Sequence, residues 1–465
     1  MNLRDVPRRC FQGVSPALLA TCDAEGIPNV TYLSQVHYVD DEHVALSCQF
    51  FNKTKKNVQE NPFICLDLVD PATLETYRVE ARHVRDETSG PLFDRMSARI
   101  QAIASHTGMA GIFKLRSADV YAVTEVTKVE HLEPGLDASM SGLEPAPPPL
   151  PVPFRSEMST LQCVCQRVSR ATDLGTLLES VLDVLAEALG FAHSMVFLVD
   201  ESGERLYVIG SHGYGESGVG AEVALGDGLI GTVARERCIL RVAGVGAELR
   251  YGRAIRAAVH RAGGGRRLGP EVPLVGLVDA QSQLALPLVA GDRLVGVIAV
   301  ESESTTAFEE WHEAFLEIIA TQVAAAIDAM VRRGREEVSL AAPETAPSAP
   351  PKPSTAPRRK RRFRYFAEDG CVFVDDEYLV RNVPGRILYR LLRSHVDTGR
   401  TDFSNRELRL DTSIGLPAIR DNLESRLVLL KKRLEEKSVD LALVSIGRGQ
   451  FRLEVTCDVE LEEAP

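Results

Sequence analysis

The sequence predicts a multidomain chain: an all-β barrel, then an α+β domain, then a domain of three helices with a terminal β-hairpin. Two observations predict this organisation. At 465 residues the chain is too long for a single hydrophobic core and has room for about three domains of ordinary size. Two Pro- and Ala-rich stretches, 132–153 and 336–357, have the composition of extended spacers. They leave segments 1–131, 154–335 and 358–457, and an acidic tail at 458–465.

The composition is that of a soluble globular protein, with 45% apolar and 25% charged residues. No early segment joins a basic start to a long apolar run, and the longest apolar stretches are interrupted by charge. We therefore expect neither a secretory signal nor a membrane span, and a cytoplasmic location. Among nine cysteines only Cys163 and Cys165 are close in sequence, so reduced thiols are expected, with no disulfide framework and no metal site.

The net charge of −12 is unevenly distributed. Between Arg358 and Cys457 there are 21 Lys and Arg against 15 Asp and Glu, so this segment is basic while the rest of the chain is acidic. Such an asymmetry is typical of a protein in which one domain meets a polyanion.

The first segment has the pattern of a β-meander followed by more strands. Short apolar runs with turns between them predict strands at 15–22, 29–33, 36–39, 43–48, 63–69, 75–84 and 119–129, with helical residues near 92–105. Many strands in about 130 residues favour a small barrel.

This order resembles the pyridoxamine-phosphate-oxidase-like, FMN-binding split barrels over nearly the whole segment. The resemblance rests on LLATCDAEGIPNVTYLS, VHYVDDEHVALS and the K-x-x-K-N-V-x-x-N-P pattern from Lys53 to Pro62. It implies FMN as a possible cofactor and a homodimer with the flavin at the subunit interface. The residues implied at the flavin phosphate are Lys53, Lys56 and Asn57, and those along the ring are Val30, Thr31 and Tyr32.

The phosphate assignment agrees with elementary electrostatics, since cations and free N–H groups at a helix N-terminus suit a phosphate dianion. The family usually has an arginine in this loop, whereas this chain has lysines, which lack the bidentate guanidinium. A barrel that has kept its fold and lost the cofactor is the alternative.

The middle segment alternates helical and strand patterns. An apolar stripe at spacings of three and four runs through Thr160–Gly190, strand pairs follow, and a long helix is predicted from Phe308 to about Arg333. The pieces LGDGLIG (225–231) and LALPLVAGDRLVGVIAVES (284–302) closely resemble GAF domains. In that family a pocket over one sheet face takes small ligands.

The GAF ligand is not identified by the sequence. The region from Arg241 to Leu277 is long and rich in Gly and Arg, and it is either a lid over an anionic ligand or a solvated loop. If it is a lid, the candidate ligand residues are Tyr251, Arg253 and His260. The apolar stripe of the last helix is compatible with packing on its own sheet or with a dimeric helical seam.

The last segment begins with a basic run, Arg358–Arg364. It then predicts a strand pair at 372–380, helices at 386–395, 404–410 and 417–437, and a hairpin at 441–455. Three helices with a terminal hairpin are the pattern of a winged helix-turn-helix. LLKKRL (429–434) and GRGQFRL (447–453) resemble the OmpR-type output domains of response regulators. By position the third helix would enter the major groove of DNA. The candidate DNA-binding residues are Arg400, Arg420, Asn422, Ser425, Arg426 and Arg448.

Taken together, the sequence favours a dimeric, cytoplasmic, signal-responsive regulator in which a barrel and a GAF domain sense a flavin, a redox state or a small molecule and control a DNA-binding winged helix. Two alternatives stay open: a flavin-dependent oxidoreductase with regulatory domains, and a signalling scaffold whose winged helix binds protein. No paired catalytic carboxylates, nucleophile elbow or P-loop is present, so no catalytic residue is assigned.

Overall fold

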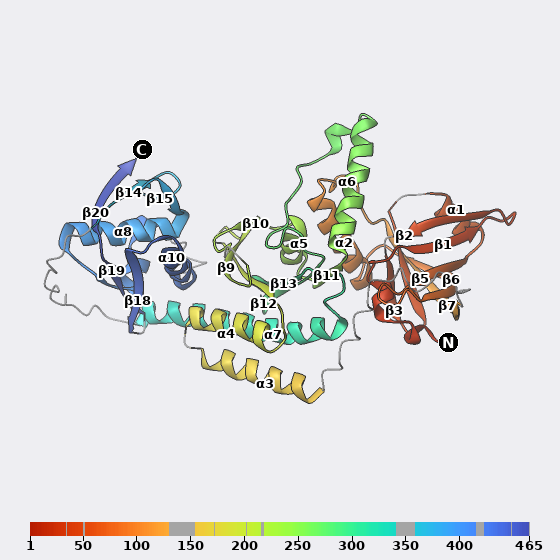
Figure 1. Cartoon of the computed structure of the whole chain (residues 1–465), viewed down its shortest axis with the longest axis horizontal. Helices are drawn as coiled ribbons and strands as arrows, with labels where there is room; N and C mark the ends of the chain where they lie inside the picture. The colour runs from red at the N-terminus through yellow and green to blue at the C-terminus, as the bar shows by residue number, and fades with distance from the viewer. Residues whose placement is uncertain are drawn as a thin grey trace, which may run out of the picture.

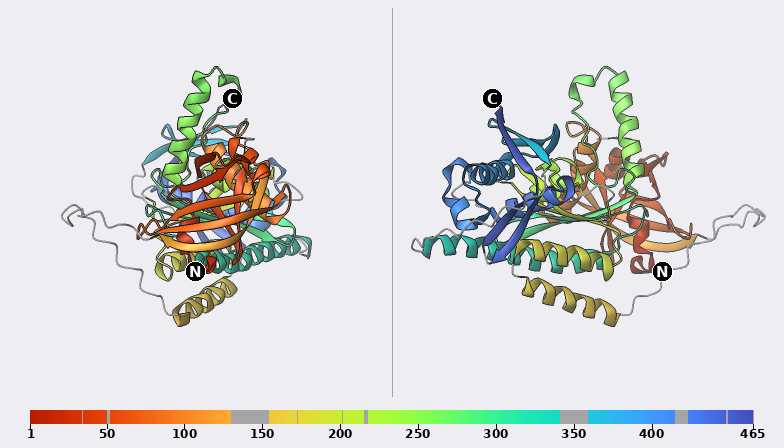
Figure 2. Two further views of the ribbon diagram at one scale, coloured as in Figure 1. Left: turned by 90° about the vertical axis from the view of Figure 1, so that its right-hand side faces the viewer. Right: turned by 60° about the vertical axis from the view of Figure 1, so that its left-hand side comes forward.

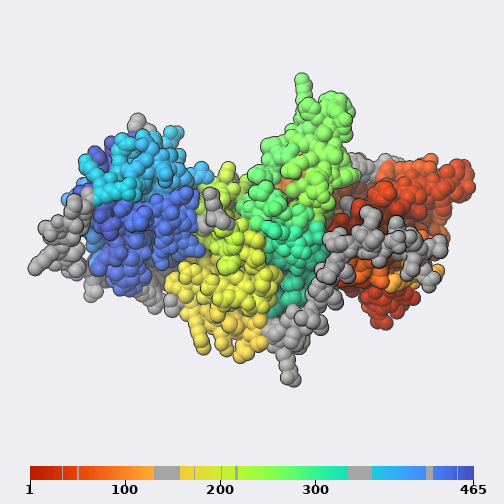
Figure 3. Space-filling model, in the orientation of Figure 1, coloured from red at the N-terminus to blue at the C-terminus, as the bar shows by residue number. Residues whose placement is uncertain are grey.

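The computed structural model of the chain describes residues 1–129, 154–340 and 359–464, apart from residues 34, 50–51, 172, 201, 215–217, 415–422 and 448. These residues form three bodies in a row, with the middle one in contact with both others (Figure 1). A space-filling view shows the C-terminal body packed against the middle one (Figure 3).

The N-terminal domain is a seven-stranded antiparallel sheet with a barrel-like form and the strand order β2-β1-β5-β6-β7-β4-β3. The predicted strands are confirmed to within a few residues. They are β1 (Ala17–Cys22), β2 (Pro28–Leu33), β3 (Val36–Asp40), β4 (His43–Cys48), β5 (Phe63–Val69), β6 (Thr76–Glu87) and β7 (Ser117–Val129). Helix α1 (Lys53–Glu60) follows β4, and helix α2 (Pro91–His106) follows β6. Alternate residues of β5 are buried, which is the periodicity expected of a sheet with one face on a core.

The middle domain is a six-stranded antiparallel sheet, in the order β10-β9-β8-β13-β12-β11. Its strands are β8 (His193–Val199), β9 (Arg205–His212), β10 (Glu222–Ala224), β11 (Leu240–Ala243), β12 (Ser282–Ala290) and β13 (Arg293–Ser302). Its helices are α3 (Phe154–Arg170), α4 (Leu174–Glu187), α5 (Gly228–Glu236), α6 (Val245–Arg261) and α7 (Glu310–Leu340). Helices α4 and α7 lie along one side of the sheet and α5 on the other (Figure 1).

Two expectations for this domain are corrected. The apolar stripe through Thr160–Gly190 is two helices, because Asp173 accepts a hydrogen bond from the Thr176 backbone N at 2.9 Å and thereby caps the start of α4. The region from Arg241 to Leu277 is more than a loop, since it contains the 17-residue helix α6. This helix projects from the body of the molecule in both further views (Figure 2).

Helix α2 belongs to the N-terminal domain by sequence but to the middle domain by packing. Its buried residues Ala98, Ala102 and Ile103 are part of the middle domain's hydrophobic core. The barrel and the middle domain therefore share a core element and are expected to unfold together.

The C-terminal domain has two small sheets around three helices. The predicted helices are observed as α8 (Asn382–Thr398), α9 (Asn405–Leu410) and α10 (Leu423–Lys437), and the predicted hairpin as β18 (Leu441–Gly447) and β19 (Gln450–Val455). The short strand β17 (Asp402–Ser404) pairs with β19. The predicted cap of α9 is confirmed, because Ser404 Oγ accepts from the Glu407 backbone N at 3.3 Å.

The acidic tail is corrected to a strand. Residues Asp458–Ala464 form β20, which pairs in parallel with β14 (Lys360–Phe366), beside β15 (Cys371–Val374) and β16 (Glu377–Val380). Basic residues of β14 lie opposite acidic residues of β20, as in the pair Lys360–Glu460 at 3.3 Å. The basic run is therefore largely neutralised within its own domain, because the register sets opposite charges side by side.

One helix among the described residues, Glu310–Arg332 within α7, is long and apolar enough to cross a membrane by length and composition alone. Half of its most apolar window is buried inside the protein. Residues Phe315, Ile319, Val323 and Ile327 lie in the middle-domain core, which accounts for the apolar composition and makes the fold consistent with a soluble protein. The exposed part of the stripe includes Ile318.

Candidate functional site

A cavity of about 670 Å³ lies between the barrel and helix α6 of the middle domain. This volume is within the range of small-molecule sites, roughly 300–1,000 Å³. The barrel contributes residues from β1 to β4, from β7 and from the loop before α1, while α2 and α6 close the other side. Its apolar lining includes Leu19, Leu33, Leu46, Ile100, Ile103, Phe113, Tyr121 and Ile255.

The structure places the predicted cofactor residues in different surroundings. Thr31 and Tyr32 line this cavity, but Val30 does not, because successive residues of β2 point to opposite sides of the strand. Lys53 and Lys56 are exposed, and Lys56 Nζ lies 3.7 Å from Glu60. The prediction that Asn57 faces a phosphate is not supported, since its buried side chain donates to Thr21 Oγ1 at 3.2 Å.

The lysine on the cavity wall is Lys55, which the sequence did not single out. It is 9% exposed, and its Nζ donates to Asp119 at 2.7 Å and to Asp86 at 2.8 Å. Burial lowers and the two carboxylates raise the pKa of Lys55, with a net increase, so it stays charged and paired.

The second cation on the wall, Arg99 of α2, is also paired. Its guanidinium forms an ion pair with Glu248 of α6 and donates to the Arg241 carbonyl at 2.9 Å. His37 lies beside them on β3. Burial, together with nearby Arg99, lowers the pKa of His37 to about 3, so the imidazole is neutral near pH 7.

These residues fit a flavin in part. The apolar walls and the polar groups between them suit a planar heteroaromatic ring. A phosphate needs cations that are not already paired, and Lys55 and Arg99 each have carboxylate partners. The lining thus fits the ring of FMN and does not fit its phosphate.

The three predicted lid residues do not converge. Tyr251 lines the cavity described above, facing the barrel. Arg253 Nε is 3.1 Å from Glu271, and His260 lies in the last turn of α6, outside the cavity lining. A single ligand held by all three is excluded by this arrangement. Tyr251 instead shares the cavity with Thr31 and Tyr32, so two sites predicted separately are partly one.

The middle domain also has a buried polar cluster around Glu301. Its carboxylate accepts from Gln283 Nε2 at 2.6 Å, the Leu277 backbone N at 2.8 Å and the Tyr214 hydroxyl at 3.0 Å. Burial raises the pKa of Glu301. The cluster ties the segment after α6 to the sheet and has no hydrogen bond to the predicted lid residues.

Helix α10, the predicted DNA-reading helix, is docked on the middle domain. Ser425 and Arg426 are 3% and 5% exposed. The Tyr207 hydroxyl on β9 donates to Ser425 Oγ at 2.8 Å, and the Arg426 guanidinium lies 4.1 Å from the centre of the Tyr207 ring. The prediction of an accessible DNA-contacting face at these two residues is therefore wrong for this conformation.

The remaining predicted DNA contacts are placed only in part. Arg400 Nη2 is 2.6 Å from Glu407, and its guanidinium lies over the Phe403 ring. Arg420, Asn422 and Arg448 lie outside the described residues.

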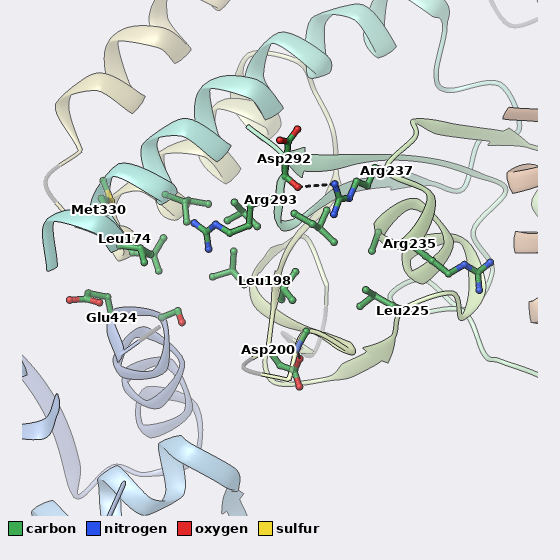
Figure 4. Close-up of a pocket in the computed structure, with 18 residues that line it drawn as sticks. Leu174, Leu198, Asp200, Leu225, Arg235, Arg237, Asp292, Arg293, Met330 and Glu424 are labelled. Atoms are coloured by element: carbon green, nitrogen blue, oxygen red, sulfur yellow. Dashed lines mark hydrogen bonds between the residues drawn. The ribbon is translucent and has the colours of Figure 1, made fainter. Parts of the chain in front are cut away.

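Two cavities flank the docked helix. One of about 520 Å³ lies between α10 and the middle domain, with Glu424 and Leu174 on facing elements (Figure 4). On its middle-domain side Arg237 donates to the Asp292 carbonyl at 2.7 Å (Figure 4). The other, of about 270 Å³, is lined by Tyr207, Glu222, Arg381 and Arg426 among others. Arg381 of the C-terminal domain pairs with Glu222 at 3.0 Å. The docking surface is therefore incompletely packed.

Comparison with known families assigns two of the three domains. Residues 171–328 match the GAF domain model. This part of the chain is a GAF domain. Residues 4–127 match the pyridoxamine 5'-phosphate oxidase model, so the barrel is a domain of that kind. The pair indicates a multidomain sensory or signalling protein. A search of curated proteins finds no significant match to the chain.

Solved structures with similar parts are short relatives of single domains. The GAF domain of an Acinetobacter phosphoenolpyruvate-protein phosphotransferase is 21% identical, covers 38% of this chain and 95% of its own, and gives a TM-score of 0.32. An FMN-binding protein from Syntrophomonas wolfei is 18% identical, covers 28% and 87%, and gives 0.24. Group A Streptococcus HupZ is 21% identical, covers 26% and 95%, and gives 0.22.

The functional residues that the sequence pattern did not reveal are mostly those whose partner is in another domain. Lys55, Arg99 and Tyr207 appear in the sequence as an unremarkable lysine, a helix arginine and a strand tyrosine. Only Lys55 had a usable pattern, because Asn52 precedes α1 as its cap and the cap fixes which lysine of the helix faces inward. Within the described residues, no group of three or more His, Cys, Asp or Glu could hold a metal.

Proposed function

We propose that the chain is a signal-responsive regulator whose barrel and GAF domain sense a flavin or another small molecule and control a DNA-binding winged helix formed by residues 360–464. The observation that carries the proposal is the docking of α10 on the GAF strand β9, through Ser425 and Arg426. A regulator needs an output surface whose accessibility depends on its sensor, and this contact provides one.

The element order supports the winged-helix assignment. Helices α8, α9 and α10 are followed by the hairpin β18–β19, whose loop carries Gly449 at a positive φ of 65°. Winged helices place the third helix of such a unit in the major groove and the hairpin loop on the backbone. In the docked state this helix is covered, so the proposed ground state does not bind DNA through α10.

The docking contact also favours a second function. A helix that already packs on protein through Ser425 and Arg426 fits a signalling scaffold whose winged helix binds other proteins. The flavin-dependent oxidoreductase alternative has less support, because the cavity wall, over the residues described, holds no set that we can assign to a reaction.

A duplex-binding experiment separates the first two functions. The full chain and its Tyr207→Ala variant are titrated with a random-sequence duplex at low salt, followed by fluorescence anisotropy. Removing the ring abolishes the hydrogen bond to Ser425 and the cation–π contact, so we expect the variant to bind at least tenfold more tightly, with an affinity that falls steeply with salt. Arg78→Ala, on the far barrel surface, is the matched control and leaves binding unchanged.

Charge reversal tests whether the DNA contact is the predicted one. Adding Arg420→Glu to Tyr207→Ala is expected to remove the gain, since Arg420 precedes α10 at its predicted reading end. Absence of duplex binding by both the full chain and Tyr207→Ala at low salt would refute DNA binding and leave the scaffold function.

We also propose that the chain forms a homodimer through the outer face of the barrel sheet. On this face Leu18 lies opposite Tyr32 in the β1–β2 pair, and Ala20 lies opposite Val30. Val30, Phe63 and Tyr32 are 59%, 55% and 74% exposed. Side by side on neighbouring strands, they form an apolar surface of the kind that marks a protein contact. Light scattering of the chain and of Val30→Asp tests this, and a monomer in both would refute it.

A further inference from the structure

The polar groups of the cavity between the barrel and α6 distinguish between kinds of ligand. Both cations on its described wall, Lys55 and Arg99, are ion-paired with carboxylates that also border or approach the cavity, Asp119 and Glu248. His37 is neutral near pH 7 for the reasons given above. The wall therefore has no excess of positive charge, and transferring an anion into it would cost free energy that no unpaired cation returns.

One buried acceptor on the wall has no partner. Gln35 donates through Nε2 to the Phe11 carbonyl at 3.2 Å, while its Oε1 is buried and lacks a hydrogen bond among the described residues. A buried carbonyl oxygen without a donor is costly, about 1–3 kcal/mol, and points to a donor that a ligand brings. The ligand chemistry that meets this need is a ring with an N–H edge.

The GAF helix α6 completes the cavity. Ala247, Tyr251 and Ile255 follow one another at intervals of four, so they share one face of α6, and this face is turned to the barrel. Gly252 lets the helix approach α2, since a Cβ there would lie 2.6 Å from Thr107 Cγ2. The barrel alone thus has an open mouth, which the GAF domain of the same chain closes.

We infer that this cavity binds an uncharged planar heteroaromatic ligand with an N–H edge, held jointly by the barrel and helix α6, in preference to a phosphorylated flavin. The inference deepens the proposed sensor function and rests on it. The ring lies against the apolar wall, Gln35 accepts from its N–H edge, and Tyr251 covers it from the GAF side. A ligand that touches both domains gives the GAF domain direct information about occupancy of the barrel.

The test uses the purified full chain and three probes: lumichrome and riboflavin, which are uncharged, and FMN, which carries the phosphate. Binding is followed by quenching of flavin fluorescence. Lumichrome and riboflavin are expected to bind, and FMN to bind at least tenfold more weakly than riboflavin. Tyr251→Ala is expected to weaken binding of both uncharged probes at least fivefold, whereas Arg253→Ala, on the same helix but outside the cavity, leaves it unchanged.

A second variant tests the charge argument directly. Asp86→Asn removes one of the two carboxylates that pair with Lys55, on the more exposed side of that pair. It is expected to raise the affinity for FMN and leave that for riboflavin unchanged, so the ratio of the two affinities falls.

The outcomes are distinguishable from those of the duplex experiment. FMN binding more tightly than riboflavin and losing that advantage in Lys53→Ala would overturn the inference and restore the phosphate site predicted from the sequence. Absence of quenching by all three probes would overturn it as well. In either case Tyr207→Ala can still bind the duplex, and the regulatory function would stand with a different ligand.

Discussion

The GAF domain meets its two neighbours through interfaces of opposite character. The barrel interface is built around α2, which contributes Ala98, Ala102 and Ile103 to the GAF core. At the end of α2, Ser105 Oγ accepts from the Gly228 backbone N at 2.9 Å and His106 Nε2 accepts from the Leu229 backbone N at 3.0 Å. These two side chains of the barrel cap the GAF helix α5, whose own Asp227 makes no capping hydrogen bond.

The interface with the C-terminal domain has little shared core. Leu429 is the residue of α10 that is buried in the GAF core, and the other contacts are polar or charged, with the two cavities beside them. Lys432 is partly buried there, and burial lowers its pKa. The difference teaches that barrel and GAF domain act as one unit, while the C-terminal domain is docked by contacts that can be exchanged for solvent or a ligand.

The strongest way to break this contrast is to remove apolar contact from α2. Ile103→Ala leaves a cavity in the shared core and is expected to lower the free energy of unfolding by about 2–5 kcal/mol. Barrel and GAF signals should shift together in a denaturant titration followed by domain-specific labels. Arg95→Ala, exposed on the same helix, is the control, with a change within about 0.5 kcal/mol. Separate transitions in Ile103→Ala would contradict the shared core.

Acid separates the interfaces by their titratable groups. His37 has a folded pKa of about 3, below its unfolded value of about 6.5, so the unfolded chain binds the additional proton as the pH falls below 6.5. The free energy of unfolding is therefore expected to decrease on acidification, by about 2 kcal/mol between pH 7 and 5 from this residue. His106, whose pKa is lowered by burial, acts in the same direction.

The pH dependence is measured by denaturant unfolding at several pH values. His37→Gln should remove about one proton from the slope. An unchanged slope would show that His37 is not held neutral. At the other interface, Lys432 has a lowered pKa when docked, so docking is expected to strengthen as the pH rises toward its ordinary value.

The cap supplied by the barrel gives a smaller effect. Ser105→Ala removes the hydrogen-bond partner of the Gly228 N–H and is expected to cost about 1 kcal/mol of stability. Hydrogen exchange of the first turn of α5 should accelerate, although the substitution is in another domain. Ser105→Thr keeps the hydroxyl and serves as control. Unchanged exchange in Ser105→Ala would mean that the cap does not hold α5.

The smallest expected change sharpens the view of the C-terminal interface. Tyr207→Phe keeps the ring over Arg426 and loses the hydrogen bond to Ser425, so docking should weaken by about 0.5–1.5 kcal/mol. Hydrogen exchange in α10 is expected to increase, with no change in the unfolding of barrel and GAF domain. A shift of the global unfolding transition instead would show that this docking is part of the shared core.

Within single domains the sequence predicted the structure well. Period-two and period-four patterns located most strands and helices, because each element packs on a core formed by its own segment. The failures have a common cause. Helix α6 was missed because its polar sequence, rich in arginine, has a narrow apolar face that is buried against the barrel and not against its own sheet.

The candidate sites were predicted less well than the fold, for the same reason. Thr31 and Tyr32 were found because a family pattern names them, whereas the pairing of Lys55 with Asp119 depends on the register of β7 against β4. The burial of Ser425 and Arg426 depends on where a neighbouring domain sits. Spacing along one chain does not contain that information.

The parallel pairing of β14 with β20 has a consequence for any shortened form of this domain. Removing 458–464 would leave the backbone N–H and C=O groups of β14 unpaired along one side, next to the basic side chains that β20 now neutralises. An edge of that kind recruits strands from other molecules. Truncated forms are therefore poor surrogates for studying output, since self-association and non-specific attraction to polyanions would both imitate a gain of binding.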